Sequence, residues 1–287
     1  MSTYLVAGGD LRNAHIANLL CVENNVRVIG FDDNSRFKKE IKVCLDPKEL
    51  CGTIDRIVLP LPVSIDNYTV NTPLFNRKLT LEEVINTAPK IVFGGMISDK
   101  INSMCAGKGI PVVDYFVREE LAVCNAVATA EGAIQIAMEE LPFTIHETKC
   151  LITGYGRVAR VLSKSLFGLG ARVTVAARKL SDIAWAGVNS MTAIHISELG
   201  RHIKDFPLII NTVPAKIFDC AILSGADRDA LIIDLASKPG GVNFEDAKKL
   251  NFKVIWALSL PGKVAPFTSG KIIYNTINNI VKELEVT

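Results

Sequence analysis

The stretch that most limits the possible folds of this chain is the glycine turn at residues 154–159, together with the elements on either side of it. A short apolar run, Cys150–Thr153, has the length of a buried strand, and Gly154-Tyr155-Gly156-Arg157-Val158-Ala159 follows at once. Apolar residues then recur at helical spacing. Gly170 can end that helix, and Arg172–Ala176 is a second strand rich in β-branched residues. A strand, a tight turn, a helix and a second strand in this order are typical of a dinucleotide-binding unit.

Each small residue of this turn has a physical task. Gly154 permits a sharp turn, Gly156 lets the backbone approach a pyrophosphate, and Ala159 lets the helix and the strand pack closely. The N–H groups of Arg157 and Val158 lie at the positive end of the helix, which attracts phosphate. An ordinary glycine turn is the alternative, but the flanking strands favour a nucleotide site that includes Gly154, Gly156, Arg157 and Val158.

The end of the second strand indicates which dinucleotide binds. A site for NAD usually has a carboxylate about 20 residues beyond the glycines, where it binds the ribose 2′-hydroxyl. The strand ends here in Ala177-Arg178-Lys179, and the first acid, Asp182, comes later. Arg178 and Lys179 offer cations to a 2′-phosphate, so we predict NADP, with NAD as the alternative. Two solvated charges at a strand end are the competing interpretation.

The composition sets further limits. A length of 287 residues favours two domains. A hydrophobic content of 49% with a net charge of only +2 indicates a large core and no electrostatic affinity for nucleic acid. No apolar run reaches the roughly 18 residues of a membrane helix, and the start MSTYLVAGGD has no export signal. We therefore expect a cytoplasmic protein that does not bind membranes. The mean hydropathy of +0.28 predicts a homo-oligomer or a partner interface.

The seven cysteines are scattered and contain no C-x-x-C pair. This pattern favours reduced thiols and argues against a zinc site. Cys44 and Cys51 lie close in the sequence, but no nearby histidine completes a set of ligands. We therefore expect no metal, whereas a nucleophilic cysteine stays open.

The N-terminal part predicts another α/β unit whose first turn differs. Tyr4–Ala7 and Val26–Phe31 are predicted strands, and Gly8-Gly9-Asp10 leads into a helix over residues 11–22. The G-x-G-x-x-G order is absent, and Asp10 can cap the helix by accepting its free N–H groups. Arg12 and His15 would then lie near the carboxyl edge of the sheet, where open α/β folds bind ligands.

Strands and helices alternate through the rest of the chain. Further strands are predicted at 56–59, 91–93 and 111–114, with helices at 81–87 and 98–108, and a loop at 63–80. A long helix, Glu119–Glu140, is stopped by Pro142 and is expected to act as a hinge. Gly132 in its middle marks either a close approach of substrate or backbone, or ordinary helix packing.

Four more strands follow the glycine turn, at 191–196, 208–211, 231–234 and 253–257. With the first two they make six, the count of a full dinucleotide-binding sheet. Two loops leave the ends of neighbouring strands on the edge expected for nicotinamide, and their predicted contact residues are Asn211, Thr212, Val213, Pro214, Ala236 and Ser237. Ordinary turn chemistry is the alternative for both loops.

These elements predict an α/β fold with two doubly wound, parallel-sheet (Rossmann-like) domains and a cleft between them. The substrate-side domain is expected at residues 1–120, completed by a final helix at 271–287. Residues 121–143 are expected to link it to an NADP-binding domain at 144–270.

Four segments resemble one family, the A subunits of dipicolinate synthases from endospore-forming bacteria. They are Gly8-Gly9-Asp10 with Arg12, the run NAVATAEGAI at 125–134, the glycine turn, and LPGKVAP at 260–266. They span almost the whole chain, and the second and fourth are far more specific than any dinucleotide motif. The sequence departs from the family pattern at Phe267 and Ser269, where the family favours Lys and Ala, so a substrate contact of that lysine is not carried over to this chain.

The resemblance implies NADP-dependent oxidation of dihydrodipicolinate to dipicolinate, in the cytoplasm of the mother cell during sporulation. It also implies a complex with the flavoprotein-like B subunit of dipicolinate synthase. A small dicarboxylate needs cations, and the candidates are Arg12, Arg118, Lys238 and Lys263. Glu131 and His15 are the candidate bases, although His15 on an apolar helix face can equally be a packing residue. The expected catalytic set is therefore Arg12, Glu131, His15 and Lys263.

Two other functions are compatible with the residues. One is an NADP-dependent dehydrogenase acting on an amino acid or a shikimate-like acid, which would have the same architecture. The other is a non-catalytic, NADP-binding scaffold protein within a complex, since no evident acid–base pair stands in the sequence.

Overall fold

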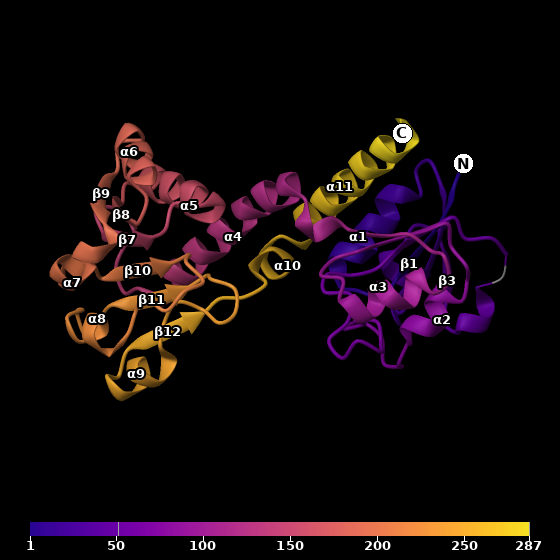
Figure 1. Ribbon diagram of the computed structural model, residues 1–287, viewed down its shortest axis with the longest axis horizontal. Coiled ribbons are helices and arrows are strands. Elements are labelled where there is room, and N and C mark those ends of the chain that lie inside the picture. Colours follow the sequence, from indigo (N-terminus) through magenta and orange to yellow (C-terminus); the bar gives the residue numbers. More distant parts are fainter. Residues whose placement is uncertain (51, 287) are drawn as a thin grey trace. The chain divides into compact units, whose positions relative to one another are not determined.

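Two units, each built on a parallel six-stranded sheet, make up the chain (Figure 1). The computed structural model describes residues 1–50 and 52–286. Unit 1 comprises Met1–Cys124 and the chain from Ala265 onward, and unit 2 comprises Asn125–Val264. The predicted fold class, α/β with two Rossmann-like parallel sheets, is confirmed.

The sheet of unit 1 has the order β3-β2-β1-β4-β5-β6. Its strands are β1 (Thr3–Ala7), β2 (Asn25–Ile29), β3 (Lys42–Cys44), β4 (Arg56–Val58), β5 (Ile91–Gly94) and β6 (Val112–Asp114). The sequence predicts five of them and misses β3, because three residues at the edge of a sheet are too few to show a pattern. The strand order reverses between β1 and β4, which is where open α/β sheets bind ligands.

Alternation along the strands of unit 1 builds a core on each face of its sheet. Tyr4 and Val6 face a core formed with α1 (Leu11–Leu20) and α11 (Pro266–Val286). Leu5 and Ala7 face the opposite core, formed with α2 (Leu81–Ile85) and α3 (Asp99–Ala106). Because side chains alternate with a period of two in a strand, one short apolar run supplies both cores.

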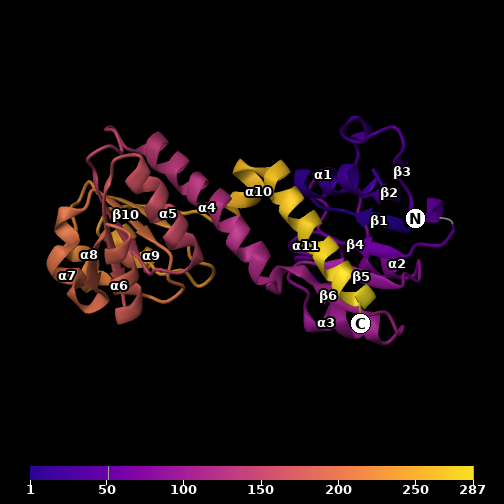
Figure 2. The same ribbon diagram turned by 90° about the horizontal axis from the view of Figure 1, so that it is seen from above.

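Helix α11 belongs to unit 1, although it lies at the far end of the sequence. It packs along α1, as Figure 2 shows. The predicted start at Lys271 is wrong, because the helix begins at Pro266, where a proline fits the first turn without losing a needed hydrogen bond. Gly270 allows this packing, since a Cβ there would lie 2.7 Å from the carbonyl oxygen of Arg12.

The sheet of unit 2 has the order β12-β11-β10-β7-β8-β9, so β7 is central and the order reverses between β7 and β10. Its strands are β7 (Lys149–Thr153), β8 (Arg172–Ala177), β9 (Thr192–His195), β10 (Leu208–Asn211), β11 (Leu231–Asp234) and β12 (Lys253–Trp256). All six strands that the sequence predicts are found, and their ends differ from the predicted ends by at most one residue, which is within the usual uncertainty of element boundaries.

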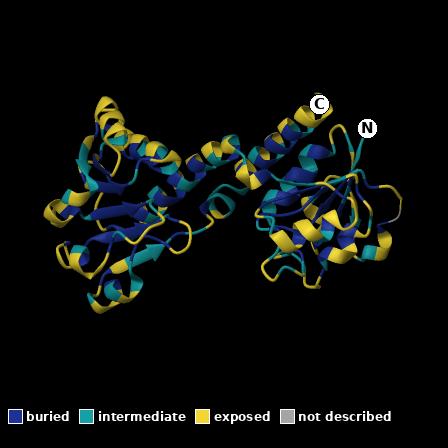
Figure 3. Cartoon of the chain, in the orientation of Figure 1, coloured by how far each residue is buried: buried dark blue, intermediate teal, exposed yellow. Residues whose placement is uncertain are grey.

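Helices cover both faces of this sheet, and its inner strands are buried while the edge strands β9 and β12 are only partly buried and the outer helix surfaces are exposed (Figure 3). One core contains residues of α4 (Glu119–Glu140), α5 (Arg157–Gly168) and α6 (Leu180–Val188). The other contains residues of α7 (Leu199–His202), α8 (Cys220–Ser224) and α9 (Phe244–Lys249). A short helix, α10 (Leu260–Val264), ends the unit.

Helix α4 has the predicted bounds and carries Gly132 in its middle. A Cβ at Gly132 would lie 3.2 Å from atoms of Leu260, so this glycine makes room for the packing of α10. By length and composition α4 could cross a membrane. Its Ala130, Ala133 and Ala137 are nevertheless fully buried in the core of unit 2, as in the core helix of a globular unit.

Candidate functional site

The glycine turn between β7 and α5 leaves the start of the helix open. Gly154 has a φ of +86°, and a Cβ there would lie 2.8 Å from atoms of Thr212 and Val213. Gly156 is the N-cap of α5, and no side chain caps the helix there. A Cβ on Gly156 would meet nothing within 4 Å. The positive end of α5 therefore faces open space, as an anion-binding helix start must.

The residues of the turn differ in their exposure, and Ala159 packs in the core as the sequence predicts. Ala159 is fully buried in the core of unit 2, Val158 is half-buried and Arg157 is exposed. Tyr155, which the sequence leaves unassigned, is buried, and its hydroxyl accepts a hydrogen bond of 3.2 Å from Asn189 Nδ2. The turn is thus anchored through Tyr155, while Gly156 is exposed.

Two cations stand at the end of β8. Ala177 is buried, whereas Arg178 and Lys179 are exposed and precede α6. Within the described part of the chain, neither cation makes a hydrogen bond or an ion pair. Asp182, the first acid after them, forms an ion pair with Arg160 at 3.6 Å. The carboxylate that favours NAD is absent from this strand end, and two unpaired cations stand there instead.

The two predicted loops lie at the ends of β10 and β11, on the same edge of the sheet as the glycine turn. Thr212 and Val213 are half-buried, while Pro214 and Ser237 are exposed. Asn211 and Ala236 are buried, and the side chain of Asn211 points into a hydrogen-bond network rather than to the surface. Asn211 is therefore placed to order a loop, not to touch a ligand.

The sequence does not predict a role for two further residues of this network. Thr153 ends β7 and Asp234 ends β11, and both are fully buried. The sequence does contain a signal for Asp234, namely an aspartate at the end of an apolar strand. Aspartate is almost never fully buried without partners, so this position predicts a hydrogen-bond network.

The corresponding turn of unit 1 is filled. A Cβ at Gly8 would lie 2.6 Å from Val70 and 2.8 Å from Thr72, and the N–H of Gly9 donates to the carbonyl of Asn71 at 2.8 Å. Asp10 caps α1 by accepting from the N–H of Arg12 at 2.9 Å, as predicted. This helix end already has a negative charge.

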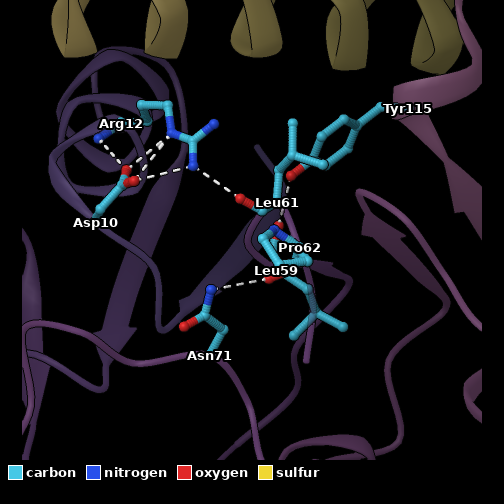
Figure 4. A network of polar contacts seen from close by, with 7 residues as sticks. All are labelled: Asp10, Arg12, Leu59, Leu61, Pro62, Asn71 and Tyr115. Carbon is cyan, nitrogen blue, oxygen red and sulfur yellow. Dashed lines mark hydrogen bonds and ion pairs between the residues drawn. The ribbon is translucent and has the colours of Figure 1, made fainter. Parts of the chain in front are cut away.

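The guanidinium of Arg12 is also engaged (Figure 4). Nε and Nη2 donate to the carboxylate of Asp10 at 2.9–3.1 Å, and Nη2 donates to the carbonyl of Leu61 at 2.7 Å. Leu61 lies in the segment after β4. The bond therefore connects the start of α1 to that segment, at the point where the strand order of unit 1 reverses. Among the residues described, Nη1 alone has no protein partner, which leaves one edge of Arg12 for a ligand.

His15 is a packing residue on α1. Its ring meets Phe267 edge to face, with ring centroids 4.9 Å apart. Burial, followed by the charge of Lys271, lowers the pKa of His15 below its ordinary 6.5. Phe267, which departs from the family pattern, thus shields the histidine that was a candidate base.

The other candidates are distributed over both units. Glu131 on α4, Lys238 after β11 and Lys263 on α10 are exposed side chains of unit 2. In unit 1, Arg118 is held by Glu283 at 2.7 Å and Glu120 at 2.8 Å, so it is a poor candidate for a substrate cation. Arg12 and His15 share α1 and are the only two of the predicted catalytic residues that one element brings together within the described chain.

The cysteines do not form a site within the described residues. Six of them are thiols that form no disulfide, and Cys51 lies outside the described residues. Burial raises the pKa of Cys150 to about 12, so this thiol stays protonated and is a poor nucleophile.

Comparisons with known proteins place the chain in one family. Residues 3–116 match the family described as the N-terminal domain of the dipicolinate synthase A subunit. Over 285 residues the chain is 31% identical to the dipicolinate synthase A subunit of Bacillus subtilis, covering 98% of this chain and 96% of the relative. The chain belongs to the family of dipicolinate synthase A subunits.

The solved structures lead to the same family. The A chain of dipicolinate synthase from Bacillus subtilis superposes with a TM-score of 0.89 at 30% identity, covering 99% of this chain and 97% of the other. A transhydrogenase from Sinorhizobium meliloti has a TM-score of 0.74 at 14% identity, covering 99% and 94%. This second likeness shows that the transhydrogenase has the same fold.

Proposed function

We propose that this chain is the NADP-dependent dehydrogenase component of a dipicolinate synthase, and that it oxidises dihydrodipicolinate to dipicolinate. The observation that carries the proposal is the open, uncapped start of α5 at Gly156. The unpaired Arg178 and Lys179 at the next strand end support NADP in particular. The name of the relatives, dipicolinate synthase, supports the substrate.

The residues of unit 2 fit this cofactor. The N–H groups at the start of α5 can hold the pyrophosphate, because no side chain caps the helix at Gly156. Arg178 and Lys179 can pair with the 2′-phosphate, since a charge-assisted hydrogen bond contributes roughly 1.5–3 kcal/mol. When bound, the nicotinamide would accept a hydride from the substrate, and the loops after β10 and β11 would position it.

The substrate carries two carboxylates, so it needs cationic partners. Lys238 and Lys263 are exposed, and within the described residues neither forms an ion pair. Arg12 has one free nitrogen, Nη1, beside two that are engaged. We propose Lys238, Lys263 and Arg12 as carboxylate ligands, and Glu131 as the base, because His15 is shielded by Phe267.

The test is a spectroscopic assay of NADPH formation with enzymatically generated dihydrodipicolinate. We expect reduction of NADP by the chain, faster than with amino acids or shikimate-like acids. The Gly156→Asp variant is the control, because it should block the cofactor site alone. Absence of NADP reduction by the chain, both alone and with the B subunit of dipicolinate synthase, would contradict the proposal.

A second candidate is an NADP-binding protein that depends on its partner for the chemistry. It is favoured by one observation: two of the three guanidinium nitrogens of Arg12 are already used by Asp10 and Leu61. Activity that appears only after addition of the B subunit would select this candidate. Activity of the isolated chain would exclude it.

We further propose a complex with the flavoprotein-like B subunit, a homo-oligomeric state, and a place in the cytoplasm of the sporulating mother cell. The membership in a family named as one component of a synthase supports a partner. Light scattering on the purified chain, with and without the B subunit, measures both associations. A chain that stays monomeric and does not bind the B subunit would contradict both proposed associations.

A further inference from the structure

The last residues of three neighbouring strands form one row of polar side chains in unit 2. Asn211 ends β10, and it is in register with Thr153 of β7 on one side and Asp234 of β11 on the other. All three side chains are fully buried. The hydroxyl of Thr153 donates to Asn211 Oδ1 at 2.6 Å, and Asn211 Nδ2 donates to Asp234 Oδ1 at 2.7 Å. A continuous chain of hydrogen bonds therefore crosses the sheet at its carboxyl edge.

The carboxylate of Asp234 is saturated by donors. Besides Asn211, it accepts from the N–H groups of Ala236 at 3.0 Å, Gly241 at 2.7 Å and Val242 at 3.2 Å. These donors stand at the two ends of the loop that follows β11. One buried carboxylate thus fixes both ends of this loop, where it leaves β11 and where it approaches α9. Hydrogen bonds to an ionised carboxylate are stronger than those between neutral groups.

Asn211 fixes the neighbouring loop in the same way. Its Oδ1 accepts from the N–H of Val213 at 3.1 Å, and its Nδ2 donates to the carbonyl of Val213 at 3.0 Å. The hydroxyl of Thr212 donates to the carbonyl of Thr153 at 2.7 Å. The two loops are closely packed against each other, because a Cβ at Gly241 would lie 2.7 Å from the Val213 carbonyl oxygen.

We infer that Thr153, Asn211 and Asp234 are positioning residues for the nicotinamide half of the cofactor. The inference rests on the proposed function. The network acts through the loops 212–214 and 236–238, which it holds beside the glycine turn, while the three side chains themselves stay buried. The network borders the turn at Gly154, but none of its hydrogen bonds reaches Gly156 at the start of α5 or Arg178, on which the adenosine half depends. Loss of the network should therefore weaken the binding of the nicotinamide half and leave the binding of the adenosine half unchanged.

The experiment compares two probes on the full chain by calorimetry: NADP and adenosine 2′,5′-bisphosphate, which lacks the nicotinamide half. Asp234→Asn keeps the shape of the side chain but points an NH2 group at backbone donors. We expect NADP affinity to fall about tenfold or more, and the affinity for the bisphosphate to stay unchanged. A merely structural role would lower both affinities together.

A milder pair of variants keeps the test decisive if Asp234→Asn does not fold. Thr153→Val removes one donor from the network, whereas Thr153→Ser keeps it. Thr174→Val is the matched control, since Thr174 is a buried threonine of the adjacent strand β8 with no side-chain hydrogen bond among the described residues. We expect a roughly threefold loss of NADP affinity in Thr153→Val only.

Trp256 offers a second measurement, because its indole N–H donates to the carbonyl of Ala236 at 2.9 Å. With Trp185 replaced by Phe, the remaining fluorescence should report the loop after β11 and should change in Asp234→Asn. Equal losses for both probes, or an unchanged NADP affinity in the folded variants, would overturn the inference. Binding of neither probe by the wild-type chain would instead overturn the proposed function, and the inference with it.

Discussion

The two units have the same strand order and differ at the turn after the first strand of each sheet. In unit 1 the turn at Gly8 and Gly9 is covered by residues 70–72, and Asp10 supplies a carboxylate to the helix start. In unit 2 the turn ends at Gly156, which has open space beside it and no side-chain cap. The fold therefore provides two positive helix ends, and the local residues leave only one of them free for an anion.

The segment after the fourth strand of unit 1 explains how its turn is filled. Leu61 receives a hydrogen bond from Arg12, and the amide of Asn71 donates to the carbonyl of Pro62 at 3.3 Å (Figure 4). The hydroxyl of Tyr115, which is fully buried, donates to the carbonyl of Leu59 at 2.9 Å. In unit 2 the corresponding region, after β10, is held by Asn211 and Thr212, and it lies beside the turn without covering Gly156. The crossing segment decides whether the helix start is accessible.

The largest effect should follow from closing the turn of unit 2. Gly156→Asp gives α5 an acidic N-cap like Asp10. The unfolding temperature of the variant should therefore be unchanged or slightly higher. The same carboxylate would repel the pyrophosphate, so NADP affinity should fall at least about a hundredfold. Calorimetry measures the affinity and thermal unfolding the stability.

The reverse change is the control for this comparison. Asp10→Gly removes the acidic cap of unit 1 but leaves Val70 and Thr72 over the turn. It should therefore create no second NADP site. A hundredfold loss accompanied by a lower unfolding temperature in Gly156→Asp, or a second site in Asp10→Gly, would contradict the proposed difference between the turns.

The next effect tests whether the turn of unit 1 is tightly packed. Gly8 and Gly109 have similar positive φ values, +70° and +67°, but a Cβ is crowded only at Gly8. Both alanine variants carry the backbone strain, so Gly8→Ala should destabilise the chain by about 2 kcal/mol more than Gly109→Ala. Urea unfolding monitored in both variants gives this difference. Equal losses would mean that residues 70–72 yield easily and that the turn can open.

The elements of both sheets could be predicted because their signals are local. The bounds of α4 follow from its charged ends and from Pro142, and the strands follow from their apolar runs. The start of α11 could not be predicted, because Phe267-Thr268-Ser269-Gly270 favours a loop and becomes helical through packing against α1. Tertiary contacts override weak local preference there.

The same distinction applies to the site. The glycine turn and the cations after β8 lie within one short stretch, so the sequence predicts them together. The partners of Arg12 and the row formed by Thr153, Asn211 and Asp234 come from distant segments. Their hydrogen bonds depend on strand order and register, which a single sequence does not supply.

A smaller effect should come from the cations beside the open turn. Arg178→Ala removes a partner of the 2′-phosphate, so we expect NADP affinity to fall about tenfold while NAD affinity stays the same. Lys164→Ala, an exposed lysine on α5, is the control for a general change of charge. Calorimetric titrations with both dinucleotides give the four affinities. Parallel losses for NADP and NAD would show that Arg178 acts on the fold and not on the phosphate.

The smallest effect concerns His15 in the packed edge of unit 1. Its pKa is lowered mainly by burial and secondly by Lys271, so the folded state favours the neutral ring. The stability that this ring contributes is complete above its ordinary pKa of 6.5 and declines as the pH falls below that value. Phe267→Ala exposes the ring and should raise the pKa of His15 more than Lys271→Gln does. NMR titration measures both shifts, with the signal of His195 in unit 2 as the internal control. A larger rise of the His15 pKa in Lys271→Gln than in Phe267→Ala would mean that charge, and not the packing of α11 on α1, sets this pKa. The edge of unit 1 would then be more open than its filled turn implies.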